Sequence, residues 1–460
     1  MRLIPTVLAV SIAAAGAPAL AQDDNVALRA ELKRLAERVE TLEKENREMR
    51  KQQPPEATPA QTANTAQPAK TAGVPVPEAV NKLVKAFEGV EFAGSITGVM
   101  QKADSSGTAS GKRESRHNYR GDLTLSLPIA PSEDSEGKLF THFRFGQGTG
   151  VGLRPTYTST ANTVAFEVGD VPDDSFGILA QAWYQLKLPL FRDSANKSSD
   201  SLYLTVGKID PFVFFDQNGI ADDESSRFMN NVFVHNPLLD SGGDIGADKY
   251  GFTPGFIAKY ENSRREGAEW GVSLGAFGSG PGANFSGSLS DPFVIGQVET
   301  AATINNLPGN YRAYFWTNGR SEGYDGVVRR HSGLGASIDQ KLTEDLTLFS
   351  RLGYHGSGKV RFDRALTLGA ELAGKGWGRP DDALGLALGR LRTSSDYRRD
   401  SADIDGYRAA GYEDQAELFY RYKFNEAVEL TPDFQWIRRP GGDGSADDIK
   451  VWGLRAKIGF

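Results

Sequence analysis

The last ten residues of the chain alternate between apolar and other side chains, and this alternation constrains the fold more than any other feature of the sequence. One face of residues 451–460 is apolar and carries Trp452, Leu454, Ala456, Ile458 and Phe460. The other face carries Arg455 and Lys457. Because successive side chains of a β-strand point to opposite faces, such a strand suits a wall between lipid and water. A terminal aromatic residue on an amphipathic last strand is typical of outer-membrane barrels, and an edge strand of a soluble sandwich is the alternative.

The N-terminus indicates export. Arg2 precedes an apolar segment at residues 3–15, and Ala19-Leu20-Ala21 provides small residues at the A-x-A spacing. We therefore predict a signal peptide at residues 1–21, with an uncleaved anchor helix as the alternative. After residue 21 the sequence has no run of about 18 apolar residues, so a membrane-spanning part would have to use strands.

The composition excludes several classes of protein. Removal of the signal peptide takes away one positive charge, Arg2, so the formal net charge changes from −7 to −8 and argues against a nucleic-acid partner. Since the chain has 0 cysteines, disulfide frameworks, thiolate metal sites and cysteine nucleophiles are excluded. Hydrophobic residues make up 39% of the sequence, which is low for a helical membrane protein but expected when every second strand residue faces water.

Two segments precede the strand-rich region. Residues 26–50 contain a heptad seam with alternating spacings of four and three, formed by Leu28, Leu32, Leu35, Val39, Leu42, Asn46 and Met49. This seam predicts a coiled coil of about three heptads that associates with copies of itself. A single helix, solvated or packed on the rest of the protein, is the alternative. Residues 51–80 are rich in proline and alanine and predict an extended linker.

Residues 90–460 consist of short alternating segments separated by clusters of Gly, Asp, Asn, Ser and Pro. In one of them, Leu418, Tyr420, Tyr422 and Phe424 share a face opposite Glu417, Arg421 and Lys423. Comparable segments number about sixteen to eighteen, and we predict an all-β fold, a transmembrane antiparallel barrel of about 16 strands with 18 as the alternative. A barrel this wide is too large to fill with wall side chains, so its interior should hold water. Pro432 lies inside a predicted strand and indicates a bulge or a rim position.

Three separated stretches also resemble a known family. The first comprises Val206-Gly207-Lys208-Ile209-Asp210-Pro211, Phe214-Phe215-Asp216-Gln217-Asn218, Ala221, Glu224 and Phe228-Met229-Asn230. The second comprises Asn236-Pro237-Leu238-Leu239-Asp240-Ser241-Gly242-Gly243-Asp244-Ile245-Gly246, ahead of Pro254-Gly255. The third comprises Leu430-Thr431-Pro432-Asp433-Phe434-Gln435-Trp436-Ile437-Arg438 with Pro440-Gly441-Gly442. In this order they resemble the carbohydrate-selective porins of the OprB type, although the coiled coil and the linker are not part of compact sugar porins.

The resemblance implies a barrel in the outer membrane of a Gram-negative cell, with the coiled coil in the periplasm. Expected partners are sugars and other small hydrophilic solutes, outer-membrane lipid and further copies of the chain. A trimer is favoured because porin barrels often pack that way, and a dimer is next because an asparagine at a core position, here Asn46, commonly accompanies two strands. Contact between the coiled coil and the cell wall is a further alternative. No nucleic acid, cofactor or metal is expected.

A channel that favours sugars needs aromatic rings for C–H faces and charged or amide groups for hydroxyls. By alternation, Trp183 should face the lumen on one strand, and Arg312, Tyr314 and Trp316 should do so on another. A register slip of one residue would instead place the two tryptophans in the aromatic girdle. Residues 222–230 predict a loop folded into the lumen, with a surface loop as the alternative. The candidate constriction groups on and near it are Asp216, Asn218, Glu224, Arg227 and Asn230.

Enzymatic chemistry finds little support in the sequence. The 5 histidines are scattered, without the spacing of metal ligands, and no catalytic residues are predicted. We expect a passive outer-membrane channel that prefers carbohydrates. Two alternatives stay open, a general or anion-preferring porin and a structural protein that tethers the outer membrane to the cell wall through the coiled coil. The anion alternative rests on cations expected in the lumen, namely Arg120, Arg144, Arg351, Arg421, Arg455 and Lys457.

Overall fold

The computed structural model describes residues 89–460 except for 133–134, 155–160, 167–173, 191–198, 240–246, 248–249 and 281–282. These residues belong to one compact unit of the chain, Glu78–Phe460. The predicted signal peptide, coiled coil and linker lie outside the described residues. No helix within the described part has the length and apolar character needed to cross a membrane.

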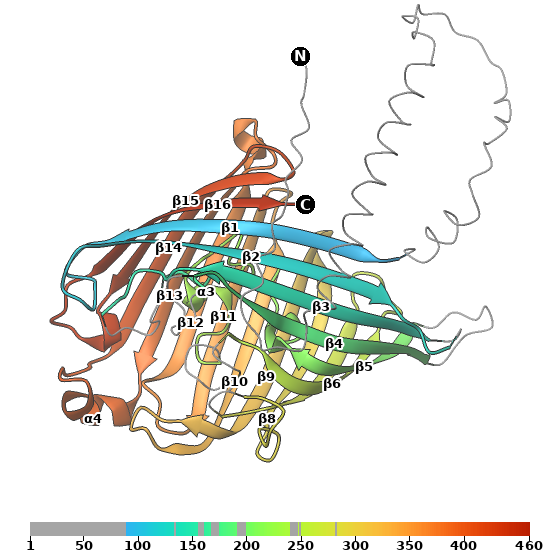
Figure 1. Ribbon diagram of the computed structural model, residues 1–460, viewed down its shortest axis with the longest axis horizontal. Coiled ribbons are helices and arrows are strands. Elements are labelled where there is room, and N and C mark those ends of the chain that lie inside the picture. Colours follow the sequence, from blue (N-terminus) through green and yellow to red (C-terminus); the bar gives the residue numbers. More distant parts are fainter. Residues whose placement is uncertain are drawn as a thin grey trace, which may run out of the picture. The chain divides into compact units, whose positions relative to one another are not determined.

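The described residues form a closed antiparallel barrel of sixteen strands, in which each strand pairs with its sequence neighbours and β1 pairs with β16 (Figure 1). This confirms the all-β barrel of about 16 strands. The strands are β1 Glu91–Ala103, β2 Glu114–Pro128, β3 Glu136–Gln147, β4 Phe176–Leu190, β5 Asp200–Ile209, β6 Thr253–Asn262, β7 Trp270–Phe277, β8 Phe293–Ile304, β9 Leu307–Glu322, β10 Val328–Lys341, β11 Leu346–Ser357, β12 Phe362–Ala373, β13 Ala383–Thr393, β14 Tyr412–Lys423, β15 Val428–Arg438 and β16 Ile449–Gly459. Short helical elements are η1 Pro211–Val213, α3 Asn231–Val234, η2 Gly374–Trp377, α4 Ser395–Ile404 and η3 Pro440–Gly442.

The barrel closes where the start of β1 meets the last residue of the chain. The backbone N–H of Gly94 donates to the carbonyl of Phe460 at 3.1 Å, and the N–H of Phe460 donates to the carbonyl of Gly94 at 2.9 Å. The Phe460 ring lies over Gly94, where a Cβ atom would come within 2.6 Å of it, so a larger residue at position 94 would displace the ring. On β16, Trp452 and Ile458 are exposed on the outer surface while Arg455 is buried inside. The terminal strand therefore has the two faces that its sequence predicts.

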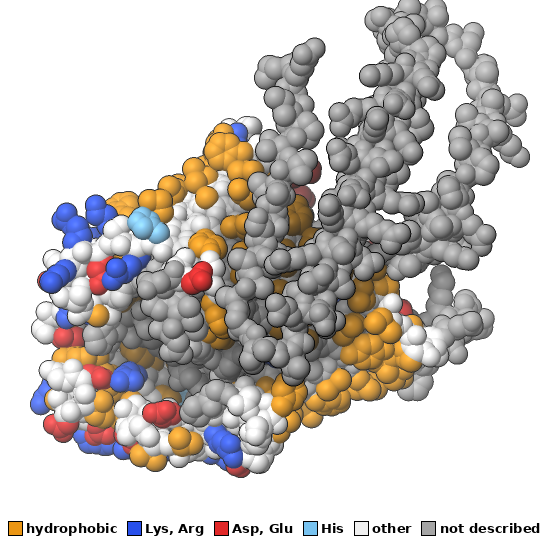
Figure 2. Space-filling model, viewed as in Figure 1, with side chains coloured by type: hydrophobic (Ala, Val, Ile, Leu, Met, Phe, Trp, Pro, Cys, Tyr) orange, Lys and Arg blue, Asp and Glu red, His pale blue; other side chains and the backbone are white. Residues whose placement is uncertain are grey.

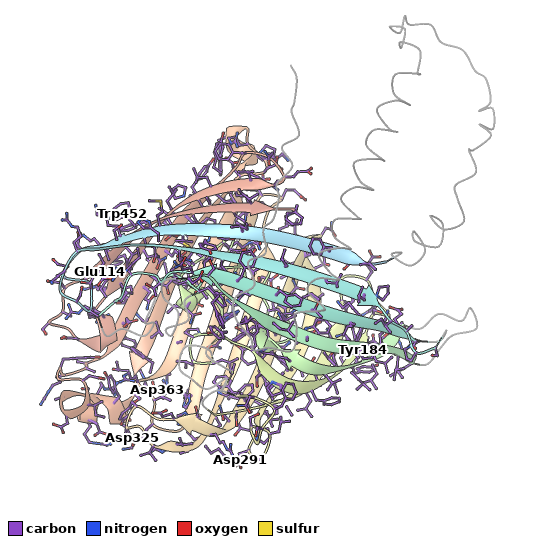
Figure 3. All side chains as sticks on the ribbon, in the orientation of Figure 1. Glu114, Tyr184, Asp291, Asp325, Asp363 and Trp452 are labelled. Carbon is purple, nitrogen blue, oxygen red and sulfur yellow. The ribbon has the colours of Figure 1, made fainter. Side chains whose placement is uncertain are left out.

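The two ends of the barrel differ in their connections. At the end where β1 begins and β16 ends, the turn between β8 and β9 contains only Asn305 and Asn306, both with the positive φ angles of a tight hairpin turn. At the opposite end lie the long connections 148–175, 210–252 and 394–411. Outer-membrane barrels have short periplasmic turns and longer extracellular loops, so the end where β1 begins and β16 ends is the periplasmic end. Tyr184 lies near this end and Glu114 near the extracellular end (Figure 3).

The outer wall is apolar between two more polar ends. Hydrophobic side chains cover the visible strand surface, and charged side chains gather at the end that carries α4 (Figure 2). Pro432 belongs to this wall within β15. The pairing between β14 and β15 has a gap there, between the pairs Phe419–Asp433 and Tyr422–Leu430, but the register is the same on both sides of the gap. Because proline has no N–H to donate, this gap fits Pro432, which lies in the middle of β15 without a bulge rather than at the predicted bulge or rim position.

The main hydrophobic core lies inside the barrel. Phe215, Phe228 and Phe233, from the connection between β5 and β6, belong to one buried cluster with wall residues such as Phe277 and Phe349. Part of the interior is therefore filled by protein, as a loop folded into the lumen requires. A connection rich in aromatic side chains folds back inside and fills much of the space that the wall alone cannot fill.

Candidate functional site

The described part of the connection after β5 crosses the barrel interior, and we call residues 210–239 the lumen segment. It starts at a capped turn, in which Asp210 Oδ1 accepts a hydrogen bond from the N–H of Phe212 at 3.0 Å and Pro211 occupies the first position of η1. α3 follows later in the segment, within the ring of strands in Figure 1, and its Val232, Phe233 and Val234 are buried.

Asp216 is the central anchor of the lumen segment. Its Oδ1 accepts hydrogen bonds from Arg351 Nε of β11 at 3.1 Å and from the Tyr314 hydroxyl of β9 at 2.7 Å. Its Oδ2 accepts one from the N–H of Asn236 at 2.6 Å. Arg351 also donates to the carbonyl of Phe233 at 2.8 Å. The side chains of Arg351 and Asp216 are both 0% exposed, so the pair binds the segment to the wall rather than contacting passing solutes.

Two predicted constriction residues are further anchors. Asn218 donates to Ser337 Oγ at 3.2 Å and to the carbonyl of Ile338 at 3.1 Å, both on β10. Asn230 caps α3 and donates from its side chain to Gln415 Oε1 at 2.9 Å and to Gln435 Oε1 at 3.1 Å. Their amides are thus used in holding the segment across the interior.

The two candidate tryptophans lie on the inner face but are covered. Trp183 is 4% exposed, stacks on Phe140 with ring centroids 4.8 Å apart and meets Phe214 of the lumen segment edge-on at 5.5 Å. Trp316 is 1% exposed, and its ring lies over Gly333, where a Cβ atom would come within 2.1 Å of it. In this arrangement neither ring offers a face to open space, and contact with a sugar stays a prediction.

Ion pairs join the other edge of the lumen segment to the wall. Arg120 Nη1 of β2 donates to Glu224 Oε1 at 2.7 Å, and Arg227 Nε donates to Glu371 Oε2 of β12 at 3.2 Å. Arg421 lies 3.6 Å from the same Glu371 oxygen and donates to the carbonyl of Ser226 at 3.4 Å. Arg455 and Lys457 also reach the backbone and hydroxyls of the segment. Cations that the sequence places in the lumen are therefore largely paired with this segment.

Arg312 reaches the lumen segment through a shared carboxylate. It is on β9 and donates to Asp339 Oδ1 of β10 at 3.3 Å. The same oxygen accepts a hydrogen bond from the N–H of Gly219, which follows Asn218 in the lumen segment, at 3.1 Å. Arg312 also lines a separate cavity of about 130 Å³.

A larger cavity lies between β1–β3 and the lumen segment. Its volume is about 1100 Å³, and we call it the β2 cavity. From Glu114 to Thr124 it follows the inner face of β2, which is about 34 Å along the strand at roughly 3.4 Å per residue. Its charged or ionisable lining comprises Glu114, Arg116, Arg120, Asp122, His142, Arg144, Asp210, Asp222, Asp223, Glu224 and His235. Phe166, Phe212 and Tyr250 add aromatic surface.

The charges of the β2 cavity are arranged in contacts across strands. Asp122 accepts hydrogen bonds from Arg120 Nε and Arg144 Nε, each at 2.8 Å, and lies 2.8 Å from His142 Nε2. Arg120 thus connects Asp122 on the wall to Glu224 on the lumen segment. Charge-assisted hydrogen bonds of this kind are strong and fix the position of both partners.

Burial and neighbouring charges give the carboxylates of the lumen segment different pKa values. Burial raises the pKa of Asp210 and of Asp222. Burial alone would also raise the pKa of Asp223, but the Lys457 ammonium and the hydrogen bonds from Ser225 together outweigh burial and lower that pKa to about 2. Burial would also raise the pKa of Glu224, but the charges of Arg120 and Arg144 together outweigh burial and lower that pKa.

Comparison with known proteins places the chain. A family model described as carbohydrate-selective porin, OprB family, matches residues 178–460, which is more than half of the chain. The chain belongs to the OprB family. The matched region includes the whole lumen segment and extends to the terminal strand.

Two curated relatives and one solved structure agree with this assignment. Porin B of Pseudomonas aeruginosa is 25% identical over 239 residues, which cover 42% of this chain and 52% of that protein. The putative porin QuiX of Acinetobacter baylyi is 27% identical over 288 residues, covering 53% of this chain and 64% of the relative. These matches therefore span only about half to two thirds of the relatives' length. The structure of Pseudomonas putida OprB has a TM-score of 0.66 at 18% identity and covers 83% of this chain and 96% of that one, a likeness of fold.

Several residues of this OprB-family site escaped the sequence reasoning. Asp122 and His142 lie on inner faces that strand alternation can identify, beside the predicted Arg120 and Arg144. Phe212, Asp222 and Asp223 line the β2 cavity because of the path of the lumen segment. No local pattern in the sequence gives that path.

Proposed function

We propose that this protein is a passive diffusion channel for small carbohydrates, with the β2 cavity as the route of passage. The observation that carries the proposal is the cavity itself, which follows β2 for most of its length and is lined by paired charges with aromatic side chains among them. Paired charges still exchange hydrogen bonds with hydroxyl groups, and aromatic surface suits the C–H faces of a sugar. Membership of the OprB family and the porin names of the two relatives support this reading.

The second candidate function is that of a general or anion-preferring porin. The lining of the β2 cavity argues against anion preference. Among the described residues that line the β2 cavity, six carry carboxylates and three carry guanidinium groups. The carboxylates of this lining, which come from the wall and from the lumen segment, thus outnumber the arginines on which the anion alternative rests. We therefore expect neutral solutes to be favoured, with cations preferred over anions.

Flux measurements in liposomes separate these candidates. With the protein reconstituted into vesicles, a neutral hexose should enter faster than a hexuronate of the same size, because the cavity carries an excess of carboxylates. The difference should shrink as salt is added, since screening weakens charge repulsion but not the passage of a neutral sugar. Vesicles without protein provide the background rate. Hexuronate or inorganic phosphate entering as fast as the hexose would contradict the proposal.

The pH dependence of ion preference follows from the carboxylates of the lumen segment. Because the pKa values of Asp210 and Asp222 are raised, these two groups lose negative charge first as the pH falls from neutral. The ratio of cation to anion permeability, measured from reversal potentials, should therefore fall at a pH above the ordinary titration range of carboxylates. Asp222→Asn removes one of these two groups and is the informative variant. It should start from a lower ratio and show a flatter pH profile, and an unchanged profile would contradict the assignment.

We also propose that residues 26–50 join barrels through a periplasmic coiled coil, with a trimer favoured and cell-wall contact as the alternative. The heptad seam supports this proposal. Sedimentation of the full chain and of a chain lacking residues 22–77 tests this proposal. If both proteins sediment as monomers, the coiled coil does not join copies of the chain.

A further inference from the structure

The outer wall of β10–β14 carries a concave surface near the extracellular end. A groove of about 680 Å³ lies there, and its apolar lining includes Leu334, Leu352 and Leu366. Arg364, Arg390 and Arg392 line the same groove together with Tyr354 and Tyr412. A second groove of about 440 Å³ lies on the same strands and is almost wholly apolar, with Leu348, Leu368, Leu386 and Leu388 among its lining residues. We call the two together the outer groove.

The arginines of the outer groove are placed unfavourably for the protein alone. Arg364 of β12 and Arg392 of β13 lie directly opposite each other in the strand register. Like charges at such positions repel, because their Cβ atoms are about 4.5–5.5 Å apart. An anion bound between these two side chains would remove the repulsion.

The carboxylates nearby do not balance the positive charge. Arg392 pairs with Asp363, which lies near the loop end in Figure 3. Arg390 and Arg439 share Asp414. Arg364 lies over the ring of Tyr354 at 5.7 Å and forms no ion pair with another described residue. Four guanidinium groups in the described structure thus share two carboxylates, and a positive excess is left on a lipid-facing wall.

The position of these arginines indicates the kind of partner. The next outward residues toward the periplasmic end are apolar, with Leu366 following Arg364 on β12 and Leu388 preceding Arg390 on β13. Both leucines are exposed on the wall. The arginines therefore mark the boundary between the apolar band and water, where lipid headgroups lie. Arg390 is also 59% exposed despite its ion pair, so its guanidinium is open to a further partner.

We propose that the outer groove binds an anionic lipid of the outer leaflet whose headgroup carries phosphate. Guanidinium groups bind phosphate through two parallel N–H···O bonds, and clustered basic residues at a membrane surface attract anionic lipids. Acyl chains would lie along the leucines of the two grooves, below the arginines. The proposal is independent of which solute passes through the β2 cavity.

Native mass spectrometry of the detergent-solubilised full chain tests the proposal, with lipid A as the probe. The wild-type protein should retain lipid A, and the triple variant R364Q/R390Q/R392Q should bind it roughly 100-fold more weakly, from about 1 kcal/mol for each basic residue near the surface. The matched control R113Q/R399Q/R408Q removes the same charge from the extracellular connections and should bind like the wild type. Lipid A without its phosphates should bind weakly to all three proteins.

A second variant tests the outer groove without removing charge. Leu366→Trp fills the groove and leaves the arginines in place, so it should weaken retention several-fold even if the triple variant fails to assemble. Equal retention by the triple variant and its control would overturn the proposal. Equal binding of phosphate-free lipid A, full displacement by inorganic phosphate, or a second copy of the chain in place of lipid would also overturn it.

Discussion

Replacement of Arg351 by methionine is expected to destabilise the barrel by about 3–5 kcal/mol and to raise its single-channel conductance. The guanidinium is fully buried and holds Asp216 and the carbonyl of Phe233, so its loss leaves a buried carboxylate short of a charged partner. The lumen segment is then released from β11. Denaturant unfolding in detergent measures the first effect, and planar-bilayer recording measures the second.

The double variant Asp216→Asn, Arg351→Met is the control for charge. It removes both members of the ion pair, so it should recover part of the lost stability while the segment stays loosened. If Arg351→Met changed neither the conductance nor the stability, Asp216 and Arg351 would not hold the lumen segment across the channel.

Replacement of Arg120 by glutamine is expected to have the largest effect on ion preference. Arg120 lies in the β2 cavity between Asp122 and Glu224, and its loss leaves both carboxylates with less compensation. Cation permeability should rise relative to anion permeability. Conductance should also rise, because the contact between β2 and the lumen segment is lost. Reversal potentials and single-channel currents from the same recordings give both quantities.

Arg144→Gln is the matched control for Arg120→Gln. Arg144 lines the same cavity, but its ion pair is with Asp122 on the neighbouring strand of the wall. The charge change is identical in the two variants, whereas only Arg120 connects the wall to the lumen segment. Arg144→Gln should therefore shift ion preference without an equal rise in conductance. Equal conductance in the two variants would contradict the role of Arg120 in positioning the segment.

The sequence predicts the wall of this protein well because the wall follows a local rule. Alternation with a period of two identifies the inner faces of β2, β4 and β9, so Arg120, Trp183 and Trp316 are on the sides that the pattern indicates. Counting alternating segments gives about sixteen to eighteen strands, and the closed barrel has sixteen in its described residues. The amphipathic terminal strand closes the barrel through Phe460.

The interior could not be predicted in the same way because it depends on contacts between distant residues. Asp216 and Arg351 are separated by 135 positions, and Asn230 and Gln435 by 205. No periodicity shows that such pairs meet, so Asp216, Asn218 and Asn230 were expected at the constriction although they anchor the segment. The contact by which Phe214 covers Trp183 also joins residues distant in the sequence, so it could not be predicted either. The anion alternative has the same cause, because the sequence shows which arginines lie on inner faces but not which carboxylates of other strands pair with them.

The most direct test of the account is labelling of single cysteines by a charged thiol reagent during hexose flux, since the native chain has 0 cysteines. Thr124→Cys lies on the lining of the β2 cavity, whereas Thr367→Cys lies on the inner face of β12 and is fully buried. We predict that the reagent lowers flux through the Thr124→Cys protein and leaves the Thr367→Cys protein unchanged. Inhibition at residue 367 together with unchanged flux at residue 124 would show that sugars do not pass along β2.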